Sequence, residues 1–284
     1  MMVVRRPAVA GQFYPYSAEN LQKAVESCFK HWKIRTRDLK NRTIKNKVLG
    51  AVVPHAGYRY SGPVAASVYA KLQPADTFVI LGPNHSGMGP DAALMMDGTW
   101  QTPLGDVHID EDMARDIVSD SNIVTPDESA HEREHSIEVQ LPFIQTIAPK
   151  AEIVPISIKH YYPEDKFLSL CTDIGKTIAS VVKDSGKQTI ILASTDFSHY
   201  EPLESASSKD ERAMDAILSR SPENLFKAVK DEKISMCGYG GVASMLTASA
   251  ILGARRAEKV SYMTSGDTTG DNSSVVGYGG AIVL

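Results

Sequence analysis

Short apolar runs that end in polar, glycine-containing loops recur along this chain and predict buried β-strands. Three such runs are Val48–Val53, Thr77–Gly82 and Gln188–Ser194. Because Pro54 favours extended geometry in the residue before it, the first strand should continue almost to His55. The second run is followed by His85, and the third by Asp196 and His199. Ligands of open α/β sheets bind at the carboxyl ends of the strands, so we expect these four side chains to share one pocket.

Between and around these strands, apolar residues at helical spacing predict helices. One helix should follow Ser17 as its N-cap, and the others cover Pro63–Leu72, Glu111–Ser119, Glu134–Ile147, Glu164–Val182, Ser205–Ser219, Pro222–Val229 and Tyr239–Leu252. Pro142 should kink or end the helix that contains it. Residues Tyr239–Leu252 are apolar nearly all round, so this helix should be buried. An edge hairpin over Thr99–Ile109 and two final strands complete the pattern.

The order of strands and helices predicts an α/β fold in which neighbouring strands are parallel. A length of 284 residues would by itself suggest about two domains, but α/β folds often form one domain of about this size. We therefore predict a single domain over residues 1–284. The composition, with 43% hydrophobic and 23% charged residues, is sufficient for a packed core.

The charge of the chain argues against nucleic acid as its main partner. The formal net charge is −4 and the isoelectric point is near 6.1, whereas a nucleic-acid surface needs a concentrated basic face. The one basic cluster lies within Lys30–Lys47. We interpret it as a solvated helix end and linker, and a specific anion site is the alternative.

Cysteine usage and apolar run lengths predict a cytoplasmic protein. Cys28, Cys171 and Cys237 are too few and too far apart for a disulfide framework, which suits a reducing compartment. The N-terminal apolar run is too short for a signal peptide, and no later run approaches the roughly 18 residues of a membrane span. We therefore expect neither a membrane nor nucleic acid among its partners.

Residues His131–His135, with the sequence HEREH, fit the H-E-x-x-H pattern of zinc peptidases. That chemistry places two imidazoles one helical turn apart, with a glutamate as general base. The turn-forming residues before the motif and its many charges disfavour a buried catalytic helix. A second spacing overlaps the motif, because His135 and Glu138 would lie on one helical face and reach the same site. The alternative for this pair is a capped helix start with an ordinary surface glutamate.

The predicted pocket contains residue types that bind transition metals. A single histidine after a strand is often only a loop anchor, but His55, His85 and His199 in loops rich in Gly, Ser and Asn favour a shared site. Cys237 precedes a predicted helix whose amides favour the thiolate, and a small buried hydrophobic residue is the alternative. Two imidazoles and a thiolate suit iron, copper or zinc better than magnesium or calcium. His199 could act as a general base whose charge Asp196 stabilises.

Seven motifs occur in a fixed order along the chain: RPAVAGQFYP, VVPHAGYRYSG, ILGPNHS, TPLG, EHSIEVQLPF, STDFSHY and CGYGG. This ordered set resembles the Memo family (mediator of cell motility), including its prokaryotic members, and covers essentially the whole chain. The family is similar in fold to the class III extradiol (LigB-like) dioxygenases. The resemblance therefore implies a single-domain layered α/β sandwich, with a central mixed, mostly parallel sheet flanked by helices. A non-haem iron pocket would lie at the strand ends.

The resemblance also implies roles for individual residues in the pocket. His55, His85 and Cys237 would face the metal, with Asp196 and His199 beside them. Ring-cleaving relatives complete their iron site with a carboxylate, whereas a cysteine stands there in this chain. A thiolate changes both the charge donation and the oxidation liability of the site. Ring cleavage therefore does not follow from the resemblance.

Further roles follow from the family's E-H-S-[IL]-E motif. It implies that His135 and Glu138 line or support the same pocket and act with the catalytic groups. His131 lies outside that motif, which weakens the zinc-peptidase hypothesis. Phe13, in the N-terminal arm, falls where animal members have an aromatic residue near the pocket mouth.

Two main hypotheses about function follow. The first is a metal-dependent, oxidoreductase-like protein of unknown substrate, with Fe(II) preferred over copper and both over zinc; a sample purified in air can lack the metal. The alternative is a non-catalytic binding module that uses the His/Cys pocket, Arg59 and free loop amides to hold a phosphorylated or aromatic group of a partner. A metal-free hydrolase is the weakest hypothesis, because no G-x-S-x-G motif occurs.

The resemblance also implies partners. Animal members of the family are described as phosphotyrosine-peptide binders, which suggests a peptide ligand. Prokaryotic members are grouped with a radical-SAM protein in the set called AmmeMemoRadiSam, of which this chain would be the B component. Companion proteins of that set are therefore expected partners.

Overall fold

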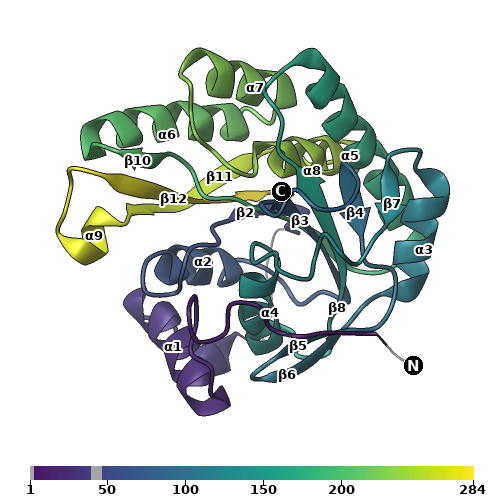
Figure 1. Cartoon of the computed structure of the whole chain (residues 1–284), viewed down its shortest axis with the longest axis horizontal. Helices are drawn as coiled ribbons and strands as arrows, with labels where there is room; N and C mark the ends of the chain where they lie inside the picture. Colours follow the sequence, from purple (N-terminus) through teal and green to yellow (C-terminus); the bar gives the residue numbers. More distant parts are fainter. Residues whose placement is uncertain (1–2, 40–46) are drawn as a thin grey trace.

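A nine-stranded sheet built from most of the chain forms the centre of the fold (Figure 1). The computed structural model describes residues 3–39 and 47–284. The strands lie in the order β10-β12-β2-β9-β3-β8-β4-β7, and β11 pairs with the outer side of β12. Their bounds are β2 Gly50–Val53, β3 Thr77–Asn84, β4 Ala92–Leu94, β7 Val124–Pro126, β8 Glu152–Lys159, β9 Thr189–Ser194, β10 His199–Glu201, β11 Ala257–Thr264 and β12 Val275–Val283.

The four central strands, β2, β9, β3 and β8, are parallel to one another. On either side of them, β12 pairs with β2 and β4 pairs with β8 in the antiparallel direction, so the sheet is mixed. Every residue of β2, β3 and β9 is buried, as expected for parallel strands that are covered on both faces. The continuous apolar runs in the sequence reflect this double cover.

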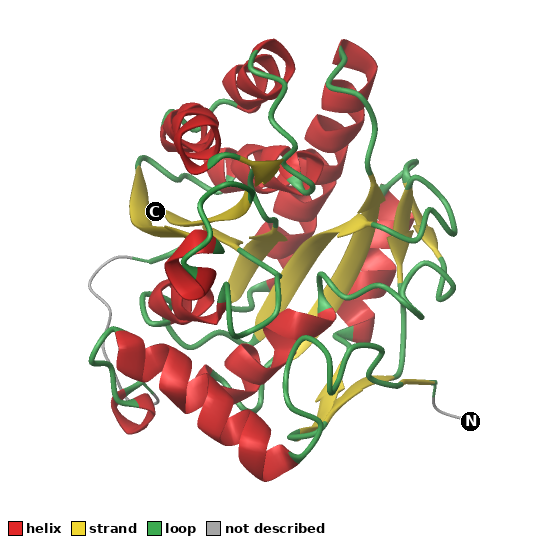
Figure 2. Ribbon diagram, turned by 60° about the vertical axis from the view of Figure 1, so that its left-hand side comes forward, coloured by secondary structure: helices red, strands yellow, loops and turns green. Residues whose placement is uncertain are grey.

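Helices form a layer on each face of the sheet (Figures 1 and 2). Their bounds are α1 Ala18–His31, α2 Gly62–Tyr69, α3 Glu111–Asp120, α4 Leu141–Ile147, α5 Asp165–Ser185, α6 Leu203–Leu218, α7 Pro222–Asp231, α8 Tyr239–Ile251 and α9 Gly266–Thr269, with 3-10 turns η1 Thr36–Asp38 and η2 Glu138–Gln140. Helices α5 to α8 lie on one face, and α1, α2 and α4 lie on the other. The predicted α/β class is confirmed, and the layered mixed sheet is the architecture implied by the likeness to class III extradiol dioxygenases.

Most predicted helices form within a few residues of their expected bounds. Ser17 is the N-cap of α1, and its side chain accepts the amide of Asn20. Helix α8 is buried along nearly its whole length, which confirms the prediction from its uniformly apolar sequence. The loop between the two final strands contains the short helix α9, which was not predicted.

The predicted helix over Glu134–Ile147 is wrong in its first turn. Residues 134–137 are not helical, and the helical structure begins with η2 and continues as α4. Pro142 occupies the first turn of α4 instead of a helix interior. A proline is favourable there, because the first-turn amides have no helical acceptor. The early part of this segment is therefore free to pack directly against the sheet.

A second, three-stranded sheet attaches the N-terminal arm, residues 3–16, to the rest of the molecule. Its strands are β1 Val4–Arg5, β5 Thr99–Thr102 and β6 Gly105–His108, in the order β1-β5-β6. The last two form the predicted edge hairpin. The arm then crosses in front of α4 toward α1 (Figure 1).

Two further expectations concern the surface of the chain. Within residues 3–39 and 47–284, no helix has both the length and the apolar character needed to span a membrane. Much of the predicted basic linker, residues 40–46, lies outside the described residues. The part of it that is described contains η1, in which Asp38 pairs with Arg35 at 2.7 Å.

Candidate metal centre

Polar residues follow all four central parallel strands at one edge of the sheet. His55 follows β2, Asp196 follows β9, His85 follows β3, and His160 follows β8. Because parallel strands all end at the same edge, the strand order β2-β9-β3-β8 places these residues side by side. The structure thus brings His55, His85 and Asp196 together, as expected from their positions after apolar runs.

The imidazoles of His55, His85 and His135 form a compact cluster at this edge. One potential ligand atom from each residue lies within 4.8 Å of the other two. The ring centroid of His55 is 5.4 Å from each of the other two, while His85 and His135 stack with centroids 4.6 Å apart. Imidazole nitrogens at this spacing suit one transition-metal ion once the three side chains move slightly closer together.

His55 is held in the tautomer that a metal ligand requires. Its Nδ1 lies 3.0 Å from Ser194 Oγ. The Ser194 hydroxyl donates its single proton to the Ser136 carbonyl at 2.7 Å and accepts the Gln140 amide at 2.9 Å. Nδ1 of His55 must therefore donate, which leaves Nε2 unprotonated. Burial also holds the pKa of His55 well below its usual value, so the ring is neutral at neutral pH.

Glu134 orients His85 and His135 through hydrogen bonds to the His85 ring and to backbone amides. This fully buried carboxylate accepts hydrogen bonds from Nδ1 of His85 at 2.9 Å, and from the amides of His85, His135 and Ser136 at 2.6, 2.8 and 2.9 Å. Burial opposes its ionisation, but the hydrogen bond from His85 and the charges of His85 and His135 hold its pKa well below the ordinary range. A carboxylate in this position fixes the tautomer of a histidine and makes it a stronger metal ligand.

The segment that carries Glu134 and His135 lies directly on β3. A Cβ atom at Gly82 would come within 2.4 Å of Ser136 Oγ, so this approach requires glycine. Ser136 Oγ also donates to the Pro83 carbonyl at 3.1 Å. The two contacts place His135 beside the end of the strand that carries His85.

Cys237 lies against His55 at the start of α8. Its Sγ is 3.3 Å from His55 Nε2, and it accepts the Asp196 amide at 3.3 Å. A Cβ atom at Gly238 would lie 2.4 Å from the Ser194 carbonyl oxygen, so glycine permits this close packing. Burial, with a smaller effect of the Asp196 charge, raises the pKa of Cys237 to about 12. Burial and the Asp196 charge thus oppose the thiolate that the helix amides were expected to favour, and Cys237 can bind a cation only by releasing its proton.

Asp196 and His199 lie beside this group. Asp196 Oδ1 accepts the His55 amide at 2.8 Å, and burial raises the pKa of Asp196 to about 6. His199 Nδ1 donates to the Ser235 carbonyl at 2.9 Å, which leaves Nε2 able to accept a proton. Both the His199 amide and its Nδ1 bond to Ser235, which lies two residues before Cys237, so His199 lies beside this group. This arrangement suits proton transfer.

Glu138 lies beneath the N-terminal arm. Its fully buried carboxylate accepts hydrogen bonds from the Arg5 guanidinium, from two arm amides at 2.8 and 3.1 Å, and from the Tyr14 hydroxyl at 2.5 Å. The expected shared helical face of His135 and Glu138 is wrong, because residues 134–137 are not helical. Glu138 thus holds the arm, while His135 faces the other imidazoles.

The H-E-x-x-H hypothesis fails on geometry. Residues 131–135 are not helical, so His131 and His135 are not one helical turn apart. The buried His131 ring packs edge-on against Trp100 at 5.6 Å, and its Nε2 lies 3.2 Å from the Ala93 carbonyl oxygen. Burial lowers the pKa of His131 to about 4. His131 is therefore a neutral packing residue in this structure.

Phe13 brings the N-terminal arm to the pocket. Its ring lies against the His135 ring, with centroids 4.7 Å apart. Its carbonyl oxygen accepts the Tyr58 amide at 2.8 Å, which ties the arm to the loop after His55. Phe13 thus occupies the position near the pocket that the family resemblance implied.

Three residues near the cluster were not predicted. His160 follows β8 directly, a signal identical to that of His55 and His85, and its Nδ1 donates to the Cys237 carbonyl at 3.0 Å. Ser194 ends an apolar run that was treated only as strand. Glu134 lies within the HEREH stretch, whose many charges argued against a buried catalytic helix, and its burial depends on contact with β3.

The fold and this edge define an α/β protein with an imidazole cluster at the carboxyl ends of parallel strands. A family model described as "Memo-like protein" matches residues 5–282. The chain belongs to this family, as its ordered motifs predicted. The match includes all of the pocket residues described above.

Full-length relatives support this assignment. A MEMO1 family protein of Methanosarcina acetivorans is 45% identical over 99% of this chain and 100% of its own. Another, from Methanothermobacter thermautotrophicus, is 42% identical over 97% of this chain and 99% of its own. A third, from Methanocaldococcus jannaschii, is 42% identical, and the match spans both chains completely.

A solved structure has a similar fold. The crystal structure of an uncharacterized protein from Escherichia coli K12 superposes with a TM-score of 0.56. The similarity covers 83% of this chain and 100% of that chain, at 14% sequence identity. At this identity the comparison concerns the fold alone.

Proposed function

We propose that this protein binds one transition-metal ion through His55, His85 and His135, with Cys237 as a further ligand, and has an oxidoreductase-like role. The observation that supports this most directly is the cluster of three imidazoles whose ligand atoms lie within 4.8 Å. Fe(II) is the preferred ion and copper the second, because a set of imidazoles with a thiolate suits both. Zinc binds similar ligands and ranks third.

The surroundings of the imidazoles fit a metal. Ser194 and Glu134 accept the Nδ1 protons of His55 and His85, so Nε2 of each ring is free to bind. These hydrogen bonds are the outer contacts that metal-binding histidines usually have. A cation would also favour loss of the proton from Cys237, whose pKa burial otherwise raises.

Other residues of the chain can handle substrate and protons. A bound iron or copper ion would supply one-electron and oxygen chemistry. His199 Nε2 can accept a proton and return it, while its Nδ1 remains bound to the Ser235 carbonyl. The Phe13 ring lies against the His135 ring on one side of the cluster. A cytoplasmic location and companion proteins such as a radical-SAM enzyme remain predictions from the separate cysteines and the family resemblance.

Anaerobic reconstitution with Fe(II), Cu(I) and Zn(II), followed by metal analysis, tests the proposal. We expect about one ion per chain in the wild type and a clear loss in His55→Ala, His85→Ala, His135→Ala and Cys237→Ala. His108→Ala is the matched control, because His108 is exposed on the edge hairpin. Equal metal content in the wild type and all four site variants would contradict the proposal.

A further inference from the structure

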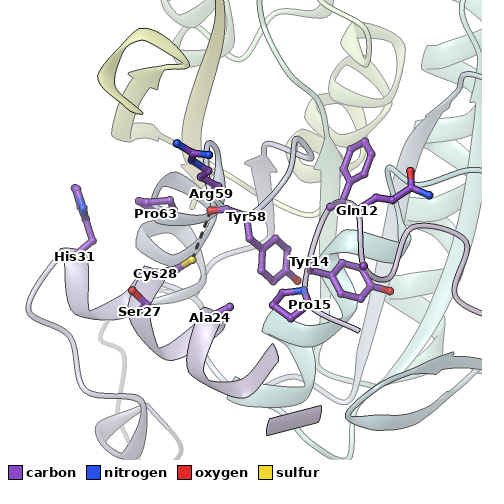
Figure 3. A pocket seen from close by; sticks show the side chains of 12 residues that line it. Gln12, Tyr14, Pro15, Ala24, Ser27, Cys28, His31, Tyr58, Arg59 and Pro63 are labelled. Carbon is purple, nitrogen blue, oxygen red and sulfur yellow. Dashed lines mark hydrogen bonds between the residues drawn. The ribbon is translucent and has the colours of Figure 1, made fainter. Parts of the chain in front are cut away.

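A groove separate from the histidine cluster lies between α1 and the N-terminal arm (Figure 3). Its volume is about 520 Å³, within the range of small-molecule sites. Figure 3 shows Ala24, Ser27 and Cys28 of α1 on one side and Tyr14 of the arm on the other, with the Tyr58 ring between them. None of the three clustered histidines lines this groove, so the groove is a separate site on the molecule.

The floor of the groove is apolar although two tyrosines form it. The rings of Tyr14 and Tyr58 pack at 5.6 Å, and both hydroxyls bond to the protein interior. The hydroxyl of Tyr14 donates to Glu138 at 2.5 Å, and that of Tyr58 donates to the Val139 carbonyl at 2.7 Å. Because both rings are nearly fully buried, only a small part of each reaches the groove, and carbon atoms of other lining residues such as Pro15 complete an apolar surface that suits an aromatic ring or an alkyl chain.

The rim of the groove favours a negative charge. Arg59 and His31 are exposed at the rim, and none of the residues that line the groove is acidic. Within the described residues, the Arg59 guanidinium has no ion pair or side-chain hydrogen bond, and it lies 5.8 Å from the Tyr60 ring centre. An unpaired guanidinium above an apolar floor can bind a carboxylate through charge-assisted hydrogen bonds.

Two contacts connect the groove to the histidine cluster. Phe13 lines the groove, and its ring also lies 4.7 Å from the His135 ring. Tyr58 and Arg59 belong to the loop that begins at His55, and the Tyr58 amide binds the Phe13 carbonyl at 2.8 Å. A molecule in the groove would therefore lie next to Phe13, on the side away from the imidazoles.

We propose that this groove binds a small amphipathic carboxylate, with its apolar body on the apolar floor and its carboxylate on Arg59. Binding in the groove itself needs no metal.

Calorimetric titration of the full-length protein in the presence of a chelator tests the proposal. The probes are 4-phenylbutyrate and its uncharged amide, 4-phenylbutanamide, which differ in the group that Arg59 would bind. We expect the acid to bind at least about tenfold more tightly, since the amide cannot form charge-assisted hydrogen bonds with Arg59. Arg59→Gln should reduce the affinity for the acid to that for the amide, and Arg255→Gln is the matched control.

A second pair of variants tests the position of the ligand. Ser27→Trp on α1 should fill the groove and abolish binding of both probes, whereas Lys30→Trp, on the same helix but outside the lining, should not. Equal affinity for acid and amide, no binding of either, or full retention in Arg59→Gln would overturn the proposal. Metal analysis of Arg59→Gln separates the two proposals, because its metal content should equal that of the wild type whichever way the titration ends.

Discussion

Arg5 and Glu138 form a buried ion pair that joins the start of the N-terminal arm to the turn η2. The Arg5 guanidinium also donates to the carbonyl oxygens of His131 and Glu134, and it lies 4.4 Å from the centre of the Trp100 ring. The pair therefore links the arm that carries Phe13 to the segment that carries His135. One side of the candidate metal centre depends on this link.

Replacement of Glu138 by alanine should release the N-terminal arm. The free energy of unfolding should fall by roughly 3–5 kcal/mol, because Arg5 would remain buried without its partner. Denaturant unfolding measures this loss, and hydrogen exchange should show faster exchange of the amides of residues 8 and 9. Glu128→Ala, an exposed change in the same region, should alter neither quantity. An unchanged stability for Glu138→Ala would show that the arm is held by other contacts.

Removal of the Glu134 carboxylate should weaken the metal centre. Glu134→Ala removes the acceptor of the His85 Nδ1 proton and of three amides, so metal affinity should fall about 10–100-fold. Glu134→Gln keeps the shape and should lose less. Competition with a chromogenic chelator measures both affinities, with the exposed Glu132→Ala as control. Identical affinities in the wild type and Glu134→Ala would remove Glu134 from any role at the site.

A methyl group at Gly82 should displace His135. The added Cβ atom would lie 2.4 Å from Ser136 Oγ and 2.8 Å from Ile137 Cγ1, so the segment must move away from β3. We expect Gly82→Ala to cost about 1–3 kcal/mol of stability and to reduce metal binding. Gly57→Ala is the control, because its nearest contact would be 3.4 Å. Normal metal binding in Gly82→Ala would mean that the segment tolerates the shift.

Acid should remove a stabilising contribution of Asp110, at the opposite end of the sheet. Its carboxylate accepts hydrogen bonds from Thr77 at 2.6 Å and Lys187 at 2.7 Å. Although burial opposes ionisation, these bonds hold the pKa of Asp110 below its usual value. Because the pKa of Asp110 is lower in the folded than in the unfolded protein, its carboxylate stabilises the fold above about pH 4. This stabilisation is lost as the pH falls further.

Denaturant unfolding between pH 7 and pH 3 tests this dependence. Asp110→Asn should be less stable than the wild type by about 1–3 kcal/mol at pH 7, and the difference should shrink toward pH 3. Asp112→Asn, at an exposed position in the first turn of α3, should track the wild type throughout. A difference that stays constant across this range would mean that the charge of Asp110 is not what stabilises the fold.

The sequence alone determined the α/β class and the edge at which the chemistry lies. Runs such as Thr77–Gly82 are apolar at every position because helices cover both faces of the sheet, so the strands could be located without coordinates. Parallel strands end at one edge, so a histidine directly after such a run belongs to a shared site. His160 followed the same rule and could have been predicted with His55 and His85.

Only the tertiary structure decided what the residues after those strands do. Glu134 and Glu138 are both acidic residues in one short stretch, yet one orients His85 and the other binds Arg5, which is 133 positions away in the sequence. Local periodicity cannot encode a partner so distant along the chain. The approach of Ser136 to Gly82 and the contact of Cys237 with His55 are likewise products of packing between segments. The sequence pattern located the strand ends at which the site forms. Packing decided that His135 is the third imidazole, and it decided the tautomers and pKa values of the histidines.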